Sequence, residues 1–366
     1  MNKAYKFRIY PTREQEELLA KTFGCCRFIY NIMLEDKIRE YKENGKMKKT
    51  TPAQYKNQFS WLREVDALAL ANVQLHLERA YKAFFSNPKT GFPRFKSKHH
   101  SRQSYTTNVV NGNISLMEGK LKLPKLKLVK IIVHREIPAD YVLKSVTVSR
   151  EASGKYYASL LYEYSSCENQ RGTVKNTEKV LGIDYAMDGM AVFSDGTKCG
   201  YPKYYRKAAE KLAREQRRLS HCVKGSHNYQ KQKRRVALCH EKVRNQRKDF
   251  HHKLSYRLAE EYDAVAVEDL DMKAMSRGLH LGKGVMDNGY GMFRGMLEYK
   301  LEDRGKKLIR TDRFFPSSKK CSVCGQVKEE LELSERVYRC SCGNEMDRDV
   351  NAAVNIREEG RRMLCA

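Results

Sequence analysis

Apolar residues in the first third of the chain follow first a strand period and then a helix period. Residues 5–10 alternate apolar and polar side chains, which predicts a short strand. Thr12 and Gln15 then form the pattern of a capping box, which predicts the start of a helix. Apolar residues recur at three- and four-residue steps over 19–33 and again over 73–84, so we expect two helices, each with one apolar face.

The spacing of apolar residues changes to a period of two between residues 91 and 164, which is typical of strands. Glycine-containing pairs at 111–112, 118–119 and 153–154 predict the turns between them. Several short strands with evenly spaced turns predict a small barrel or sandwich. The alternating pairs are Leu121 with Leu123, Leu126 with Leu128, and Val146 with Val148.

The second half of the chain begins after a polar stretch, residues 165–178, which we interpret as a linker. A strand over 264–268 is apolar until its last residue, so we expect it at the centre of a sheet with both faces covered. The other predicted elements are a hairpin over 180–184 and 190–193, a long helical region over 201–257, a helix over 293–302, a strand over 308–313 and a helix over 349–356.

Composition indicates a nucleic acid as the partner. The chain has 366 residues, enough for two or three domains, and 41% of them are hydrophobic, as in a folded protein. Its formal charge of +27 at pH 7 exceeds what solubility requires and implies a polyanionic partner. A membrane protein would need an apolar run near 18 residues or a lipidation signal, and we find neither in the sequence. Region 201–257 has 18 Lys or Arg against 4 Asp or Glu, which predicts a track for phosphates.

Four of the eleven cysteines lie near the C-terminus in two pairs, each followed by glycine. Cys321 and Cys324, together with Cys340 and Cys342, can place four thiolates around one Zn²⁺ ion at about 2.3 Å. The other cysteines are scattered without a disulfide pattern, and the N-terminus has no apolar signal segment. We therefore expect a reduced, cytoplasmic protein with a zinc ribbon.

Acidic residues at predicted strand ends are candidate ligands for catalytic metal ions. Hydrolysis of a phosphodiester by two Mg²⁺ ions requires a few carboxylates. Asp184 and Glu268 each follow a buried β-branched residue, where an anion without a counter-cation would be costly. Asp347 and Asp349 compete for a third position at the start of the last helix, because Asp347 could instead be its N-cap. These residues meet only in an RNase H-like arrangement, in which the two strands are neighbours and the helix packs across them.

Short segments spread over nearly the whole chain form a recognisable set. They are KFRIYP over 6–11, GCCRF over 24–28 with Tyr30 and Asn31, GFPRFK over 91–96, GID over 182–184, VEDL over 267–270, FPSSK over 315–319, the cysteine pairs, and DRDVNAA over 347–353. By this set the chain resembles the TnpB family, the transposon-encoded RNA-guided DNA endonucleases that are similar to type V CRISPR effectors. One departure is the single residue between Cys340 and Cys342, where the family usually has two.

The resemblance implies a multidomain α+β fold. Residues 1–10 and 91–172 would form a wedge-like β-barrel, into which a helical recognition lobe, 11–90, is inserted. Residues 173–312 and 347–366 would form an RNase H-like α/β nuclease domain of the RuvC type, with a zinc ribbon that binds target nucleic acid inserted over 313–346. The family's acidic triad falls on Asp184, Glu268 and Asp349, which favours Asp349 over Asp347.

The function implied by the resemblance is RNA-guided, Mg²⁺-dependent cleavage of DNA beside a short motif that the protein reads. The implied cofactors are two Mg²⁺ ions, one structural Zn²⁺ ion and a guide RNA. The implied partners are that RNA and double- and single-stranded DNA, with no membrane, in the cytoplasm of a prokaryote and at its nucleoid. Three alternatives stay open: a type V CRISPR effector with array-derived guides, a nuclease-silent RNA-guided DNA-binding protein, and a DNA-strand-transferring transposase of the same fold.

Overall fold

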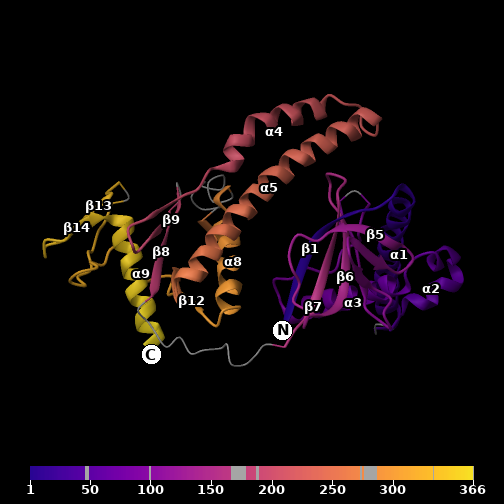
Figure 1. The fold of residues 1–366 in the computed structure, drawn as a ribbon, viewed down its shortest axis with the longest axis horizontal. Coiled ribbons are helices and arrows are strands. Elements are labelled where there is room, and N and C mark those ends of the chain that lie inside the picture. Colours follow the sequence, from indigo (N-terminus) through magenta and orange to yellow (C-terminus); the bar gives the residue numbers. More distant parts are fainter. Residues whose placement is uncertain are drawn as a thin grey trace. The chain divides into compact units, whose positions relative to one another are not determined.

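The computed structural model describes residues 1–45, 49–98, 100–165, 179–186, 189–272, 274–275, 287–332 and 334–365. The chain divides into two compact units, Met1–Ser166 and Cys167–Ala366 (Figure 1). Apart from Ser165, the linker predicted over 165–178 lies outside the described residues. None of the helices within those ranges combines the length and apolarity that crossing a membrane would need.

The first unit is built on a seven-stranded antiparallel sheet. Its strands lie in the order β2-β6-β7-β1-β5-β4-β3, so the described strands form one sheet and not the two stacked sheets of a sandwich. The elements are β1 (Asn2–Tyr10), α1 (Arg13–Asn44), α2 (Pro52–Gln58), the 3₁₀ helix η1 (Ser60–Arg63), α3 (Ala67–Ser86), β2 (Gln103–Asn108), β3 (Ser115–Met117), β4 (Lys120–Leu123), β5 (Lys127–Ile132), β6 (Val142–Arg150) and β7 (Tyr156–Glu163).

Helix α1 begins where the capping box predicts. The Thr12 hydroxyl accepts a hydrogen bond from the Gln15 backbone N–H, and the Gln15 side chain accepts one from the Thr12 N–H. The amide of Gln15 also donates to the backbone oxygens of Leu126 and Leu128, at 3.0 and 2.9 Å. One side chain therefore both caps the helix and ties it to the sheet, and the apolar faces of α1 and α3 complete a common core with that sheet.

The alternation predicted for Leu126 and Leu128 is wrong. Leu126 is buried in the turn before β5, but Leu128 is exposed, and the buried residues of this strand are Val129 and Ile131. The physical reason is a left-handed turn: Lys127 has a φ angle of 58°, a conformation that few residues other than glycine adopt. The turn shifts the strand by one position, and a shift of one position exchanges the two faces of a strand.

The second unit is built on a five-stranded sheet in the order β10-β9-β8-β11-β12. Strands β8, β11 and β12 are parallel, whereas β9 and β10 join antiparallel at one side. The elements are β8 (Val180–Ala186), β9 (Met190–Phe193), β10 (Lys198–Gly200), α4 (Tyr204–Ser220), α5 (His227–Glu261), β11 (Ala264–Glu268), α8 (Tyr290–Glu302), β12 (Lys307–Thr311), β13 (Val337–Arg339), β14 (Glu345–Asp347) and α9 (Arg348–Cys365).

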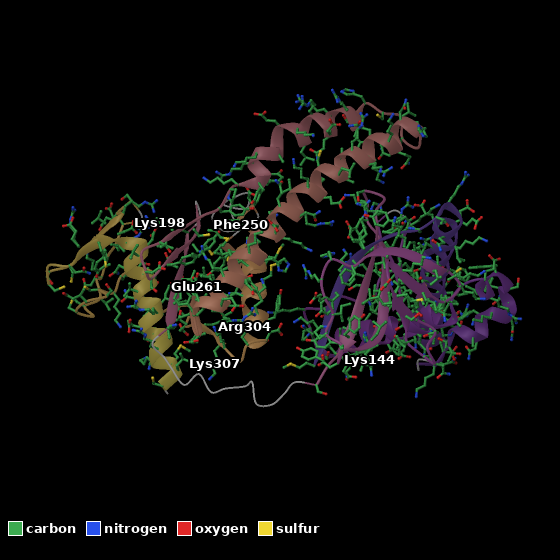
Figure 2. All side chains as sticks on the ribbon, viewed as in Figure 1. Lys144, Lys198, Phe250, Glu261, Arg304 and Lys307 are labelled. Atoms are coloured by element: carbon green, nitrogen blue, oxygen red, sulfur yellow. The ribbon has the colours of Figure 1, made fainter. Side chains whose placement is uncertain are left out.

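The helical region predicted over 201–257 is a pair of helices, α4 and α5, that run side by side (Figure 1). The chain reverses at Gly225, whose φ angle is 88°, and Ser226 caps α5 by accepting a hydrogen bond from the Tyr229 N–H. Between the helices, the Gln232 amide donates to the buried Glu215 carboxylate at 2.6 Å. Nitrogen-tipped side chains project along both helices (Figure 2), and most of the predicted cations on them are exposed.

Helix α9 packs unusually close to the sheet at two glycines. A β-carbon on Gly182 of β8 would overlap the backbone oxygen of Ala353, and one on Gly360 of α9 would lie 2.5 Å from the Ala266 side chain of β11. Only the absence of a side chain at these two positions permits the approach. Behind it, Ile356 is fully buried against both strands.

The first prediction concerns this approach. Gly182→Ala should destabilise the second unit by more than about 2 kcal/mol, because the added methyl group forces backbone apart in a packed layer. Gly295→Ala is the matched control: Gly295 is exposed within α8, and a β-carbon there would meet no atom within 4 Å. The control should stabilise the protein by about 0.5–1 kcal/mol through helix propensity. Urea denaturation followed by circular dichroism measures both, and equal stability of the two variants would contradict the close packing.

Candidate active site and metal centres

Asp184 and Glu268 lie at the same level on two neighbouring parallel strands. Ile183 of β8 pairs with Val267 of β11, and each acidic residue follows directly on its own strand. The two carboxylates are therefore side by side at the carboxyl edge of the sheet, where open α/β sheets bind their ligands. Both side chains are half-buried.

Asp349 reaches the same place from the first turn of α9. Burial raises the pKa of Asp184 well above its ordinary value, and the negative charges of Glu268 and Asp349 raise it further. Arg348 opposes this effect, and its Nε lies 3.5 Å from Asp349 Oδ1. The structure thus brings the three predicted carboxylates together, with Asp184 interacting with both of the others.

The donor set at this edge fits Mg²⁺. Three carboxylates offer hard oxygen ligands, and their mutual repulsion at Asp184 is the kind of strain that a divalent cation relieves. Among the described residues, the group of metal-ligand atoms that lie within 4.8 Å of one another is that of the four cysteines. The oxygen atoms of the three carboxylates are therefore farther apart than the four sulfur atoms. Asp184, Glu268 and Asp349 are the residues that could hold the ions.

Asp347, the competitor of Asp349, caps the helix. Its Oδ1 accepts hydrogen bonds from the N–H groups of Asp349 and Val350, at 3.0 and 3.1 Å. Its Oδ2 accepts one from Lys198 Nζ at 2.6 Å, and Lys198 is labelled in Figure 2. Burial acts to raise the pKa of Asp347, but these contacts hold that pKa below its ordinary value. Both of its oxygens are therefore engaged by the chain itself.

Two residues beside the carboxylates were missed by the sequence analysis. The buried Ser317 donates a hydrogen bond from its hydroxyl to Glu268 Oε1. Burial raises the pKa of Glu268, and this hydrogen bond partly offsets the rise. Tyr290, at the start of α8, is fully buried with its ring 4.8 Å from that of Tyr185, and its hydroxyl has no hydrogen-bond partner among the residues that the structure describes. Of these two residues, only Ser317 lies in one of the recognisable sequence segments, FPSSK.

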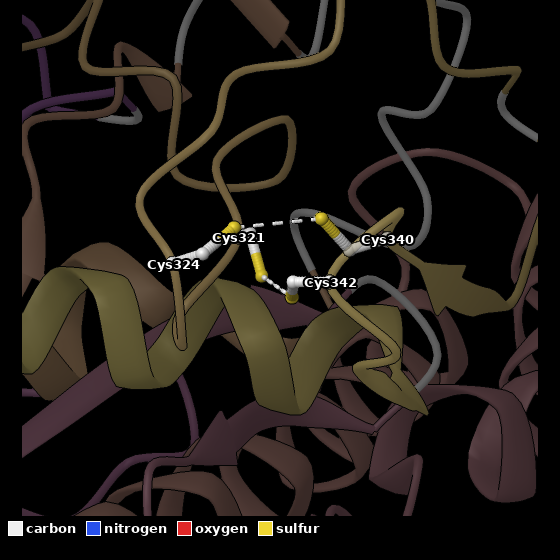
Figure 3. A group of neighbouring side chains, drawn as sticks. All are labelled: Cys321, Cys324, Cys340 and Cys342. Atoms are coloured by element: carbon white, nitrogen blue, oxygen red, sulfur yellow. Dashed lines mark hydrogen bonds between the residues drawn. The ribbon is translucent and has the colours of Figure 1, made fainter.

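The four predicted cysteines converge on one point (Figure 3). Their sulfur atoms all lie within 4.8 Å of one another, with 3.7 Å between Cys321 and Cys342 and 3.6 Å between Cys324 and Cys340. Four sulfurs held tetrahedrally at the Zn–S distance would be about 3.8 Å apart. The site therefore fits Zn²⁺, even though a single residue separates Cys340 from Cys342.

The local backbone shapes the cluster and acts directly on the Cys321 thiol. Gly325 and Gly343 follow the two pairs with φ angles of 79° and 87°, which lets the chain turn back over each pair. Burial acts to raise the pKa of the Cys321 thiol, but hydrogen bonds from the backbone N–H groups of Cys324 and Val323 bring that pKa down to about 6. A lowered thiol pKa favours the thiolate, which is the form that binds zinc.

Three sequence-family models match the chain. They are described as "Probable transposase" of the OrfB and IS605 group, over residues 161–278, "Cas12f1-like, TNB domain", over 290–356, and "Helix-turn-helix domain" of the same OrfB group, over 1–46. Within the last match, the described residues form the strand β1 and the single long helix α1.

Curated relatives match almost the entire chain. A protein of Streptomyces pristinaespiralis described as "Putative RNA-guided DNA endonuclease" is 36% identical in an alignment that covers 98% of this chain and 90% of the relative. InsQ of Escherichia coli (strain K12), with the same description, is 30% identical in an alignment that covers 99% of this chain and 93% of InsQ. Among solved structures, Cas12f1 in complex with sgRNA and target DNA has a similar fold, with a TM-score of 0.62 over 98% of both chains at 14% identity.

The second prediction concerns the thiols. The purified chain should contain one Zn²⁺ ion, and replacing Cys321 and Cys324 by Ser should release it, because two remaining thiolates cannot complete the tetrahedral set. Cys222→Ser is the control, since Cys222 lies in the turn between α4 and α5. Elemental analysis of the three proteins measures the content. Equal zinc in the double variant and in the control would remove these cysteines from the metal site.

Proposed function

This chain belongs to the TnpB (OrfB) family of IS605-type transposons, and we propose that it is an RNA-guided endonuclease that hydrolyses DNA with two Mg²⁺ ions. The relatives described as RNA-guided DNA endonucleases support the activity, and they align with this chain over nearly its full length. The observation that supports the reaction most is the meeting of Asp184, Glu268 and Asp349 from β8, β11 and α9.

In the proposed mechanism Asp184, Glu268 and Asp349 would hold the two ions, which would supply Lewis acid chemistry for the attacking water and the leaving oxygen. The role of the protein is to hold its three carboxylates in place and to orient them. Asp184 interacts electrostatically with both of the other acids. Glu268 accepts a hydrogen bond from the Ser317 hydroxyl, and Asp349 lies at the helix start that Asp347 caps.

We assign the finer domain organisation in the same way. The seven-stranded sheet, from residues 1–10 and 91–172, would be the wedge barrel, and the helices over 11–90 would be the recognition lobe. Residues 173–312 and 347–366 would be the RuvC-type nuclease domain, with the cysteine-bearing segment, 313–346, as its zinc ribbon. The Cas12f1-like TNB domain model matches residues 290–356, which contain this segment together with α8, β12 and the start of α9.

The guide RNA and the DNA target would be held by charge. Base pairing reads the target in such a system, so the protein needs to grip the backbone and not the sequence of the heteroduplex. The formal charge of +27 and the cation-covered pair α4 and α5 supply such a grip. We place the phosphate track of the sequence analysis on these two helices.

One alternative has a specific observation in its favour. A family description of "Probable transposase" fits an enzyme that transfers DNA strands with the same three carboxylates. The discriminating observation is the RNA that co-purifies with the protein. A discrete species encoded beside the element would support RNA guidance, an array-derived species would indicate a CRISPR effector, and the absence of a discrete RNA would favour the transposase.

The third prediction tests the carboxylates. Asp184→Ala and Glu268→Ala should each abolish cleavage of a matched DNA target and leave RNA and target binding nearly unchanged, because the lost groups hold metal and not nucleic acid. Asp349→Ala should do the same. Cleavage assays in Mg²⁺ and gel-shift assays on the guide-loaded protein measure the two effects.

Asp347→Ala is the matched control, two residues away on the same helix start. It should destabilise the protein by about 1 kcal/mol through loss of the cap, with a smaller loss of cleavage than Asp349→Ala. If Asp184→Ala or Glu268→Ala cleaved within a few fold of wild type in saturating Mg²⁺, the proposed site would be wrong. If Asp347→Ala were the more severe of the helix variants, the third position would belong to Asp347.

The fourth prediction tests the cation track. Neutralising four exposed residues of α4 and α5, Lys211, Arg214, Arg217 and Lys231, should weaken RNA binding and flatten its salt dependence. Each lost phosphate contact should reduce the slope of log K against log salt by about 0.7–0.9, through counterion release. Filter binding over a salt series measures the slope. An unchanged slope would make these helices a solvated surface without a role in RNA binding.

A further inference from the structure

Ser317 links the carboxylate site to the cysteine cluster. Its hydroxyl donates to Glu268 Oε1, and its side chain is almost fully buried, so the contact is shielded from solvent. Four residues later the same segment enters the cluster at Cys321. The position of the Ser317 hydroxyl therefore depends on the contacts that hold the backbone just before Cys321.

Two buried asparagines of α9 fix that chain. The Asn355 amide donates to the backbone oxygens of Ser317 and Lys320, at 2.8 and 2.6 Å. The Asn351 amide donates to the same Lys320 oxygen at 2.7 Å, and its own oxygen accepts from the Ser322 N–H at 3.0 Å. Both ends of segment 317–322 are thus hydrogen-bonded to α9, and Ser317, at the first end, contacts Glu268.

We infer that Ser317 is a positioning residue, which holds Glu268 in its metal-binding orientation and makes that orientation depend on the folded, zinc-loaded cysteine cluster. The inference rests on the proposed function, since it gives Glu268 a metal to bind. Its physical basis is general: hydrogen-bond partners of a metal-binding carboxylate fix its orientation, and their loss typically weakens metal binding by 10- to 100-fold. The cluster is then connected to Glu268 through Ser317, in addition to its connection with Asp349 through α9.

The fifth prediction tests the hydroxyl. Ser317→Ala should raise the Mn²⁺ concentration for half-maximal cleavage by the guide-loaded protein about tenfold or more, with cleavage restored at high Mn²⁺. Mn²⁺ binding to the full chain freed of nucleic acid, followed by electron paramagnetic resonance, should weaken to a similar extent. Ser318→Ala is the matched control: Ser318 is the adjacent, exposed serine and should leave both values unchanged.

A double-mutant cycle tests the dependence on the cysteines. Replacing Cys321 and Cys324 by Ser should itself raise the Mn²⁺ requirement, and adding Ser317→Ala to that variant should raise it no further, because both changes release the same carboxylate. Independent, multiplying effects would overturn the coupling, and an unchanged Mn²⁺ requirement in Ser317→Ala would overturn the role of the hydroxyl. Glu268→Gln separates the two levels: if it abolishes cleavage while Ser317→Ala is silent, only this inference fails, whereas an active Glu268→Gln defeats the proposed function.

Discussion

The second unit depends on one contact, the packing of α9 directly on the sheet at Gly182 and Gly360. Because no side chain separates helix and strands there, the first turn of α9 carries Asp349 to the carboxyl edge of β8 and β11. The next turns carry Asn351 and Asn355 to the backbone beneath the cysteines. A single helix, set at a distance that only glycine permits, therefore positions parts of both candidate metal centres.

Acidic groups gather at the candidate active site, whereas the chain as a whole is strongly basic, and both features suit the proposed chemistry. Burial and two neighbouring anions make ionisation of Asp184 unfavourable, and this repulsion has a natural remedy in divalent cations. Elsewhere the chain carries a large excess of cations, and most of those on α4 and α5 are exposed. The acidic centre suits metal ions, whereas the basic surface suits a polyanion. Both are what an enzyme that cuts nucleic acid requires.

Much of the fold was predictable because it is encoded locally. Strand and helix periods, the capping box at Thr12 and the spacing of the cysteines each operate over a few residues. The face of β5 was not predictable, since it depends on a left-handed turn at Lys127 that no glycine announces. Ser317 and Tyr290 were missed for another reason: their positions beside the carboxylates arise only when distant strands and helices assemble, and serine and tyrosine are too common to mark a site by themselves.

The most direct test of the central claim is to exchange the guide portion of the co-purifying RNA and map the ends of the cleaved DNA by sequencing. If the chain is an RNA-guided endonuclease, the cut should move to the newly matched sequence, should need Mg²⁺, and should disappear when the RNA is removed. Cleavage that stayed at its original position after the exchange, or that continued without RNA, would contradict the account.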